Sequence, residues 1–222
     1  MEALAQSHMS QSHPYRSLTG LCLLLAAAAP ALYFGTQVVA APFYPGYSFS
    51  HLSASMLGTR FSHHPAIFNV GEMLTGLAAL GGAFGLYLCF RVKTHRLLAG
   101  LIGFSVASTG VMCLKAGLFP MPDSRHNSWG LLFDFIILIP FLMLAGLLKA
   151  SRSAGLRIYL AVSVAFLLLL IPLSPWLGRG TLQRLIAVAT NVPIGVVGFS
   201  FWRELRRAWR GEPAPRVPAT PW

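Results

Sequence analysis

Long apolar stretches alternate with short polar loops along almost the whole chain. Six of these stretches run about 18–25 residues, the length that an α-helix needs to cross a hydrocarbon core of roughly 30 Å. Unpaired backbone amides are excluded from lipid, so helices are the spanning structure that this pattern favours. The predicted helices cover Leu18–Ala41, Ala66–Phe90, Leu97–Leu118, Ser128–Leu148, Leu156–Leu173 and Leu185–Trp202. The pattern therefore predicts an all-α membrane protein, a bundle of six transmembrane helices.

The first apolar stretch has a second interpretation. Arg16 precedes it, and Val38-Val39-Ala40 resembles the small-residue cleavage site of a secretory signal peptide. However, the stretch is longer than the apolar core of about 7–15 residues that such peptides carry, so an uncleaved helix is favoured. Prolines inside the predicted helices, which predict kinks, are Pro30, Pro140 and Pro193.

Positive charge is distributed unevenly between the two sets of loops. Twelve Lys and Arg residues precede the first helix, follow the sixth, or lie in the loops after the second and fourth; the opposite side holds four. Because basic loops stay in the cytoplasm, both termini are predicted to be cytoplasmic and the protein to lie in the cell inner (plasma) membrane. Residues 1–16 are predicted to be a disordered tail, 17–203 the transmembrane domain, and 204–222 a basic, Pro-rich cytoplasmic tail.

Composition supports the membrane class and excludes a nucleic-acid-binding one. Only 10% of the residues are charged, against about a quarter in soluble domains. The net charge of +11 sits mainly at helix ends, so no nucleic acid is expected as a partner. Membrane lipids are the expected partners. A membrane-protein partner or a homo-oligomer is a further candidate, because Gly81-x-x-x-Gly85 can form a helix-packing face either within the chain or between copies.

Polar residues inside the predicted helices gather near the extracytoplasmic side. They are Asn69, Glu72, Lys115, Asp134 and Asn191. Intramembrane charges cost roughly 2.5 kcal/mol or more each, so they normally face one another or a wet cavity. Two interpretations stay open. In one, an ion pair of Lys115 with Asp134 or Glu72 fixes the bundle; in the other, these residues line a pocket and a spare carboxyl exchanges protons.

The extracytoplasmic loops add groups that could do chemistry. Asp123-x-x-His126 suggests an acid–base pair, and His51 lies in the first long loop. A serine nucleophile between Ser48 and Ser55, with His51 or His126 as its base, is a further alternative, although no Gly-x-Ser-x-Gly motif supports it. The loop histidines lack a His-Glu-x-x-His or cysteine-pair pattern, so neither a metal nor another cofactor is expected.

The order of these loop motifs resembles a family of small prokaryotic multi-spanning proteins, domain of unknown function 998 (DUF998). The residues that carry the resemblance are Tyr47-Ser48, Leu52-Ser53, Ser55, Leu57-Gly58, Ser62, Phe68-Asn69, Gly71, Gly117, Phe119-Pro120, Asp123 and His126. The sequence departs from the pattern at Met56, where many relatives carry an acid. The resemblance covers about residues 20–205 and implies a six- to seven-helix bundle with a shared site on the outer face. It implies no particular reaction.

Three functions follow from these observations, in order of preference. The first is binding of a lipid or small amphiphile, or assistance to a membrane partner, through a polar extracytoplasmic pocket formed by Ser55, Asn69, Glu72, Lys115, Asp134 and Asn191. The second is an integral-membrane enzyme that acts on a lipid headgroup, with His126, Asp123 and His51 as catalytic residues. The third is a proton-coupled transporter, which the lack of visible inverted repeats disfavours.

Overall fold

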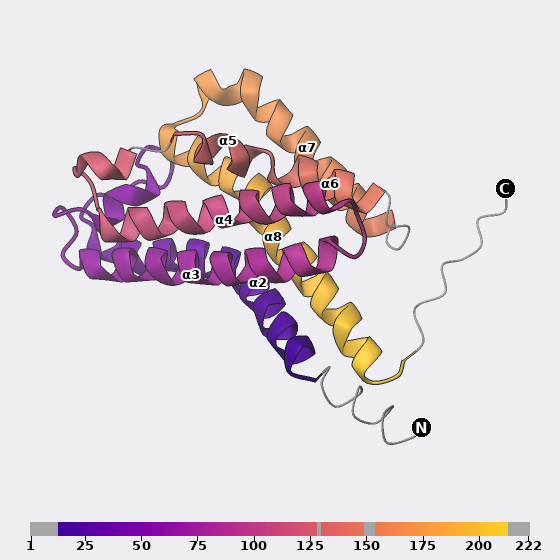
Figure 1. The fold of residues 1–222 in the computed structure, drawn as a ribbon. Helices are drawn as coiled ribbons and strands as arrows, with labels where there is room; N and C mark the ends of the chain where they lie inside the picture. The colour runs from indigo at the N-terminus through magenta and orange to yellow at the C-terminus, as the bar shows by residue number, and fades with distance from the viewer. Residues whose placement is uncertain (1–12, 128–129, 149–153, 213–222) are drawn as a thin grey trace, which may run out of the picture.

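The computed structural model describes residues 13–127, 130–148 and 154–212, and this part of the chain contains helices and no strands (Figure 1). The α-helices are α2 (His13–Ala40), α3 (Pro65–Phe90), α4 (Arg96–Leu118), α5 (Leu132–Ile137), α6 (Ile139–Leu148), α7 (Ala154–Leu173) and α8 (Arg179–Trp209). Short 3-10 helices are η1 (Ala41–Phe43), η2 (Ala54–Gly58), η3 (Ser124–Asn127) and η4 (Ser174–Trp176). Most of the two predicted tails, residues 1–12 and 213–222, lies outside the described residues.

The helix ends differ from the predicted ones at both ends of the chain. Helix α2 begins at His13, inside the segment predicted to be disordered, and α8 continues to Trp209, past the predicted end of the transmembrane domain. Pro30, Pro172 and Pro193 lie inside α2, α7 and α8.

Five helices in the described part of the chain are long and apolar enough to span a membrane, where six were predicted. The fourth predicted helix is two short helices instead, α5 and α6, which are separated at Leu138. Pro140 has no amide hydrogen, so in one continuous helix it could not donate to the Ile136 carbonyl. In α6 it lies in the first turn, where that hydrogen is not needed.

Small residues let α3 pack closely between α2 and α4. A Cβ atom added to Gly76 would lie 2.7 Å from the Gly110 carbonyl oxygen of α4, and one added to Gly82 would lie 2.7 Å from the Ala26 Cα atom of α2. Gly81 and Gly85 also face α2, so this pair packs within the chain. Such close backbone approach is how helices associate in lipid, where apolar burial provides little drive.

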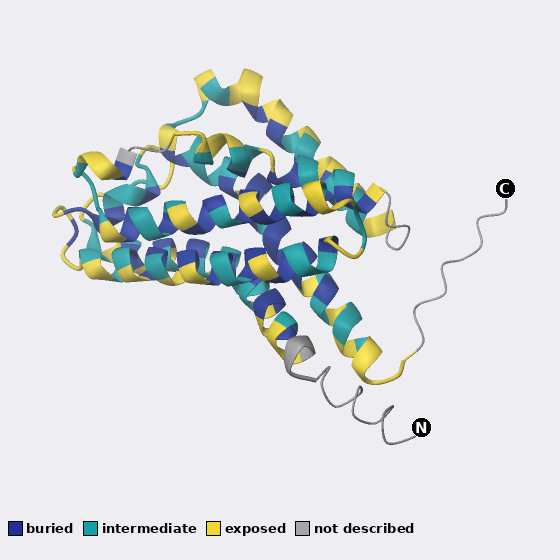
Figure 2. Ribbon diagram, viewed as in Figure 1, coloured by how far each residue is buried: buried dark blue, intermediate teal, exposed yellow. Residues whose placement is uncertain are grey.

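The outer surface of the helices is largely apolar, and several polar side chains are buried. On α3 the buried face carries Glu72 and Thr75, whereas Val70, Leu74 and Leu77 are exposed, Leu77 at 58%. Helix α7 likewise exposes a series of large apolar side chains along its length (Figure 2). An apolar exterior around small and polar interior residues fits a hydrocarbon environment.

The bundle has two different ends. At one end lie segments 41–64, 119–127 and 174–178, which join α2 to α3, α4 to α5 and α7 to α8; we call this the long-loop end (Figure 1). At the other end the Lys93 ammonium lies 3.2 Å from the Glu204 carboxylate, and Trp209 of α8 packs against Gly20 of α2. The start of α2 and the end of α8 therefore share the end opposite to the long loops.

Candidate functional site

A cavity of about 330 Å³ opens among α2, α3, α4, α5, α8 and η2 near the long-loop end. This volume lies at the lower end of the range of roughly 300–1,000 Å³ that is typical of small-molecule sites. Apolar side chains such as Phe68, Met112 and Ile136 form much of its wall. Its polar lining residues are Tyr33, Ser55, Glu72, Thr109, Arg179, Gln183, Thr190 and Asn191. Three of the six predicted pocket residues, Ser55, Glu72 and Asn191, are among them.

Glu72 is the acidic residue of this lining, and it is buried. Its side chain is 2% exposed and lies beside the Cys113 thiol, and its Oε1 atom has no hydrogen-bond partner among the described residues. A buried polar atom without a partner costs about 1–3 kcal/mol, so it is a natural recipient for a donor group of a ligand.

Ser55 and His126, 71 positions apart in the sequence, are joined by a hydrogen bond. Ser55 Oγ lies 2.9 Å from His126 Nε2, and His126 Nδ1 lies 2.8 Å from the Phe119 carbonyl oxygen. A carbonyl oxygen only accepts, so in the neutral imidazole Nδ1 carries the hydrogen and donates it. Nε2 then has a free lone pair and accepts the Ser55 hydroxyl hydrogen. The arrangement orients Ser55 Oγ toward a base.

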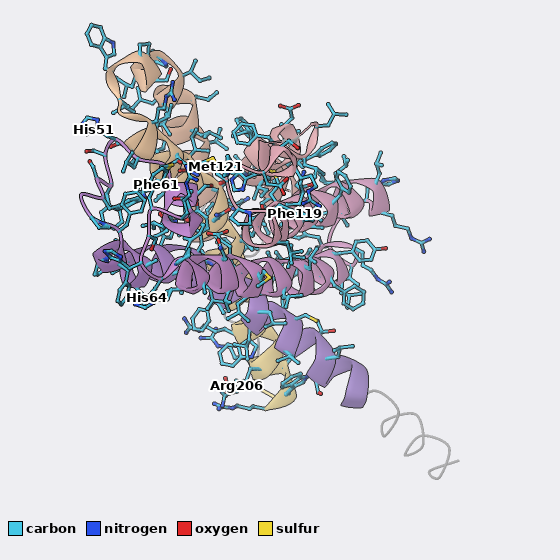
Figure 3. The ribbon with its side chains drawn as sticks, turned by 90° about the vertical axis from the view of Figure 1, so that its left-hand side faces the viewer. His51, Phe61, His64, Phe119, Met121 and Arg206 are labelled. Carbon is cyan, nitrogen blue, oxygen red and sulfur yellow. The ribbon has the colours of Figure 1, made fainter. Side chains whose placement is uncertain are left out.

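The two partners of this pair are differently exposed. His126 is 2% exposed, whereas Ser55 is partly exposed and lines the cavity. Figure 3 looks onto the long-loop end: Phe119, whose carbonyl holds the imidazole, lies toward the middle of the view, and His51 and His64 lie apart from it on the left. Ser55 is therefore the member of the pair that a ligand in the cavity can contact.

Helices α3 and α8 hold η2, the short helix that carries Ser55. The Ala54 amide donates to the Gln183 side-chain oxygen of α8 at 2.8 Å, and the Asn69 carboxamide of α3 donates to the Gly58 carbonyl oxygen at 3.2 Å. A Cβ atom at position 58 would collide with Asn69, so glycine is required for this approach. Asn69 thus holds the end of η2 through Gly58 and does not line the cavity.

Arg184 of α8 is a second anchor of the same loop. Its Nη1 atom lies 2.7 Å from the Phe49 carbonyl oxygen, 3.1 Å from that of Leu52 and 2.9 Å from that of Gly180. Its Nη2 atom donates to the Tyr47 hydroxyl, and the guanidinium lies 4.9 Å from the Phe49 ring centroid. Burial raises the pKa of the Tyr47 hydroxyl, an effect that the nearby Arg184 charge opposes.

Asp123 is engaged with Arg125 in the segment before His126. The Arg125 guanidinium donates to the two carboxylate oxygens at 2.6 and 3.0 Å, and these bonds lower the pKa of Asp123 to about 2. The His126 backbone amide donates to the Asp123 carbonyl oxygen at 3.0 Å, whereas the imidazole is held by Phe119 and Ser55. The Asp123 carboxylate thus shapes the turn of η3. His51 is exposed, and its backbone amide lies 3.3 Å from Ser48 Oγ.

The remaining predicted residues lie outside the cavity wall. Lys115 is partly buried in the last turn of α4 and has interactions of its own, and Asp134 is on the exposed side of α5. In the described part of the chain, no group of three or more His, Cys, Asp or Glu side chains is placed to hold a metal ion.

Sequence reasoning missed Gln183, Arg184 and the Phe119 carbonyl. A backbone carbonyl cannot be recognised from residue types. Arg184 was considered only as one of the four basic residues on the side with fewer positive charges. The signal that could have found Arg184 is its place directly before the predicted helix Leu185–Trp202, on the side that holds few basic residues, where a cation needs another reason to be present.

Helices of this length and hydropathy indicate the class, a multi-pass membrane protein. Residues 17–200 match the family described as "Protein of unknown function (DUF998)", so the chain belongs to the DUF998 family and the resemblance predicted from its motifs is confirmed. Comparisons with curated proteins and with solved structures find no match. The matched region contains the whole Ser55–His126–Phe119 arrangement and the cavity lining.

Proposed function

We propose that the protein binds a lipid or another acyl-chain amphiphile in the cavity at the long-loop end. The observation that carries the proposal is the composition of the cavity lining, which combines apolar side chains with Glu72, Arg179 and Gln183. An apolar chain fits the first group, and a polar headgroup with donor and acceptor atoms fits the second. Membrane lipids combine both features in one molecule.

The proposed orientation places this cavity on the extracytoplasmic side of the plasma membrane. Counted with the helix bounds predicted from the sequence, twelve Lys and Arg residues lie on the side of the two termini and four on the side of the long loops. The basic set stays in the cytoplasm under the positive-inside rule. The ligand would then come from the outer leaflet of that membrane.

Photo-crosslinking tests the proposal on the full chain. The protein is reconstituted in phosphatidylethanolamine–phosphatidylglycerol vesicles that contain a diazirine-labelled phospholipid, irradiated, and digested for mass spectrometry. We expect crosslinks at cavity residues such as Met112 and Ile136, in addition to those on the exposed helix faces.

A cavity-filling variant and a matched control sharpen this test. Ala116 is buried and lines the cavity, whereas Ala66 of α3 is exposed. Ala116→Phe should lower the cavity crosslinks at least tenfold, and Ala66→Phe should leave them unchanged; both must elute as folded protein from size-exclusion chromatography. Crosslinks confined to exposed faces in the unmodified protein would refute the proposal.

A further inference from the structure

We propose that Ser55 is a nucleophile and His126 its general base, so that the protein transfers or hydrolyses an acyl group of the bound amphiphile. The inference rests on the proposed function, because the cavity must first admit an acyl ester. The geometry behind it is the 2.9 Å separation of Ser55 Oγ and His126 Nε2 together with the 2.8 Å separation of His126 Nδ1 and the Phe119 carbonyl oxygen.

Each part of this arrangement has a chemical role. A serine hydroxyl is a weak nucleophile unless a base takes its proton as it attacks. The imidazole must present an unprotonated nitrogen to that hydroxyl, which requires a hydrogen-bond acceptor on its other nitrogen. The Phe119 carbonyl oxygen is that acceptor. It fixes both the tautomer and the direction of the ring.

Access to the two groups also fits the role. Ser55 lines the cavity and is partly exposed, so a bound carbonyl carbon can reach its Oγ atom. His126 is buried behind it, where bulk water does not compete for Nε2.

Candidate donors for the developing oxyanion line the same cavity. The Arg179 guanidinium and the Gln183 carboxamide both line the cavity with Ser55. The oxygen of Gln183 already accepts the Ala54 amide hydrogen, which leaves its NH2 group as a donor. Donors aimed at the charge that forms in the transition state supply much of the rate enhancement in acyl transfer.

The reaction is a two-step acyl transfer. Ser55 Oγ attacks the ester carbonyl carbon while its proton moves to His126 Nε2. The bond between the acyl carbon and the alcohol oxygen breaks, and the alcohol leaves with the proton from Nε2. Water or a second alcohol then attacks the acyl carbon of the Ser55 ester and gives its proton to Nε2. The Ser55 Oγ–acyl bond breaks, and Oγ recovers the proton, which releases a carboxylic acid or a new ester.

A fluorophosphonate probe tests the nucleophile, because it forms a stable phosphonyl ester with a base-activated serine. The full chain in detergent or vesicles is treated with an alkyl fluorophosphonate, and the adduct is located by mass spectrometry. We expect a single adduct on Ser55. Ser55→Ala should abolish it, whereas Ser50→Ala, an exposed serine of the same loop, should leave the rate of labelling unchanged.

A second variant tests the base separately from the fold. His126→Asn keeps an N–H donor for the Phe119 carbonyl and lacks a nitrogen that can take a proton. Labelling of Ser55 and hydrolysis of a fluorogenic medium-chain ester should each fall about a thousandfold, with unchanged elution on size-exclusion chromatography. A variant that folds and labels as fast as the unmodified protein would overturn the inference.

The diazirine-phospholipid crosslinking separates the two proposals. Cavity crosslinks without a Ser55 adduct would overturn the nucleophile and leave amphiphile binding in place. Absence of both would overturn both.

Discussion

Arg184 offers a direct test of how the structure holds the loop that carries Ser55. We expect Arg184→Ala to destabilise the protein, because the guanidinium joins α8 to the backbone carbonyls of Phe49 and Leu52 and to the Tyr47 hydroxyl. The substitution leaves these loop acceptors without their donor. Helix α8 would then hold the loop through Gln183 and the contacts of Gly178 and Thr181 with Ser50.

The size of the effect follows from the number of hydrogens. We call the contacts of the Arg184 guanidinium with this loop the Arg184 clamp. Nη1 has two hydrogens for its three carbonyl contacts, and Nη2 donates one hydrogen to the Tyr47 hydroxyl, so the clamp amounts to three full hydrogen bonds. A hydrogen bond to a charged group contributes about 1.5–3 kcal/mol when buried, and partial exposure of Arg184 reduces this to roughly 1 kcal/mol each. The expected loss is therefore about 3 kcal/mol, or roughly 6–12 °C in Tm for a chain of this size.

Thermal unfolding in detergent, followed by loss of the monodisperse size-exclusion peak, measures this loss. Arg184→Lys should recover less than half of it, because an ammonium cannot reproduce the planar fork or the stacking on Phe49. Arg60→Ala is the matched control: it also removes a cation from the long-loop end, but its ring contact is only with the neighbouring Phe61. A Tm of Arg184→Ala within 2 °C of that of Arg60→Ala would refute the clamp.

Three further predictions concern packing, pH and orientation. Gly76→Val should lower the free energy of unfolding by about 2–3 kcal/mol because the added carbons meet the Gly110 carbonyl. Gly100→Ala is the control: an added Cβ atom there meets nothing within 4 Å, so the free energy of unfolding should change by less than about 1 kcal/mol in the same assay. The pKa of Asp123 is about 2 in the folded protein and near 3.8 when unperturbed, so its stabilising effect is full above pH 4 and is lost as the pH falls through 2. The Tm difference between the unmodified protein and Asp123→Asn should accordingly shrink on acidification; a widening gap would contradict the ion pair. In a cysteine-free background, His63→Cys should react with a membrane-impermeant maleimide in intact cells and Val92→Cys should not, and the reverse result would overturn the proposed orientation.

Hydrophobic patterning predicted most of the fold because helix length in a membrane is set by the bilayer. It failed for the fourth predicted helix, Ser128–Leu148, where the structure has the two short helices α5 and α6. Length and hydropathy are the same for one helix and for two short ones. Leu138 at the break is 41% exposed, so the break reflects the backbone around Pro140, which has no amide hydrogen, and hydropathy does not register this.

The candidate site was harder to predict because its geometry joins distant segments. Glu72 and Asn191 were expected at the cavity from their depth, and both line it. Asp123 was expected beside His126 from its spacing of three residues, but its carboxylate bonds to Arg125, two residues away. The spacing of residues on a loop does not determine which neighbour a side chain bonds to. The backbone turn determines it, here the turn of η3.

Rigid helices, rather than the loops themselves, set the distance between Ser55 and His126. Ser55 is on η2, which Gln183 ties to α8 and Asn69 ties to α3, and Arg184 holds the loop that leads into η2. The His126 ring is held by the carbonyl of Phe119, the residue that directly follows α4. Because α3 and α4 pack through Gly76 and Gly110, a substitution at that crossing would shift one partner relative to the other. A substitution that disturbs the α3–α4 packing, such as Gly76→Val, should therefore also lower the reactivity of Ser55. If only the contact between the two loops set the Ser55–His126 distance, that substitution would leave the reactivity of Ser55 unchanged.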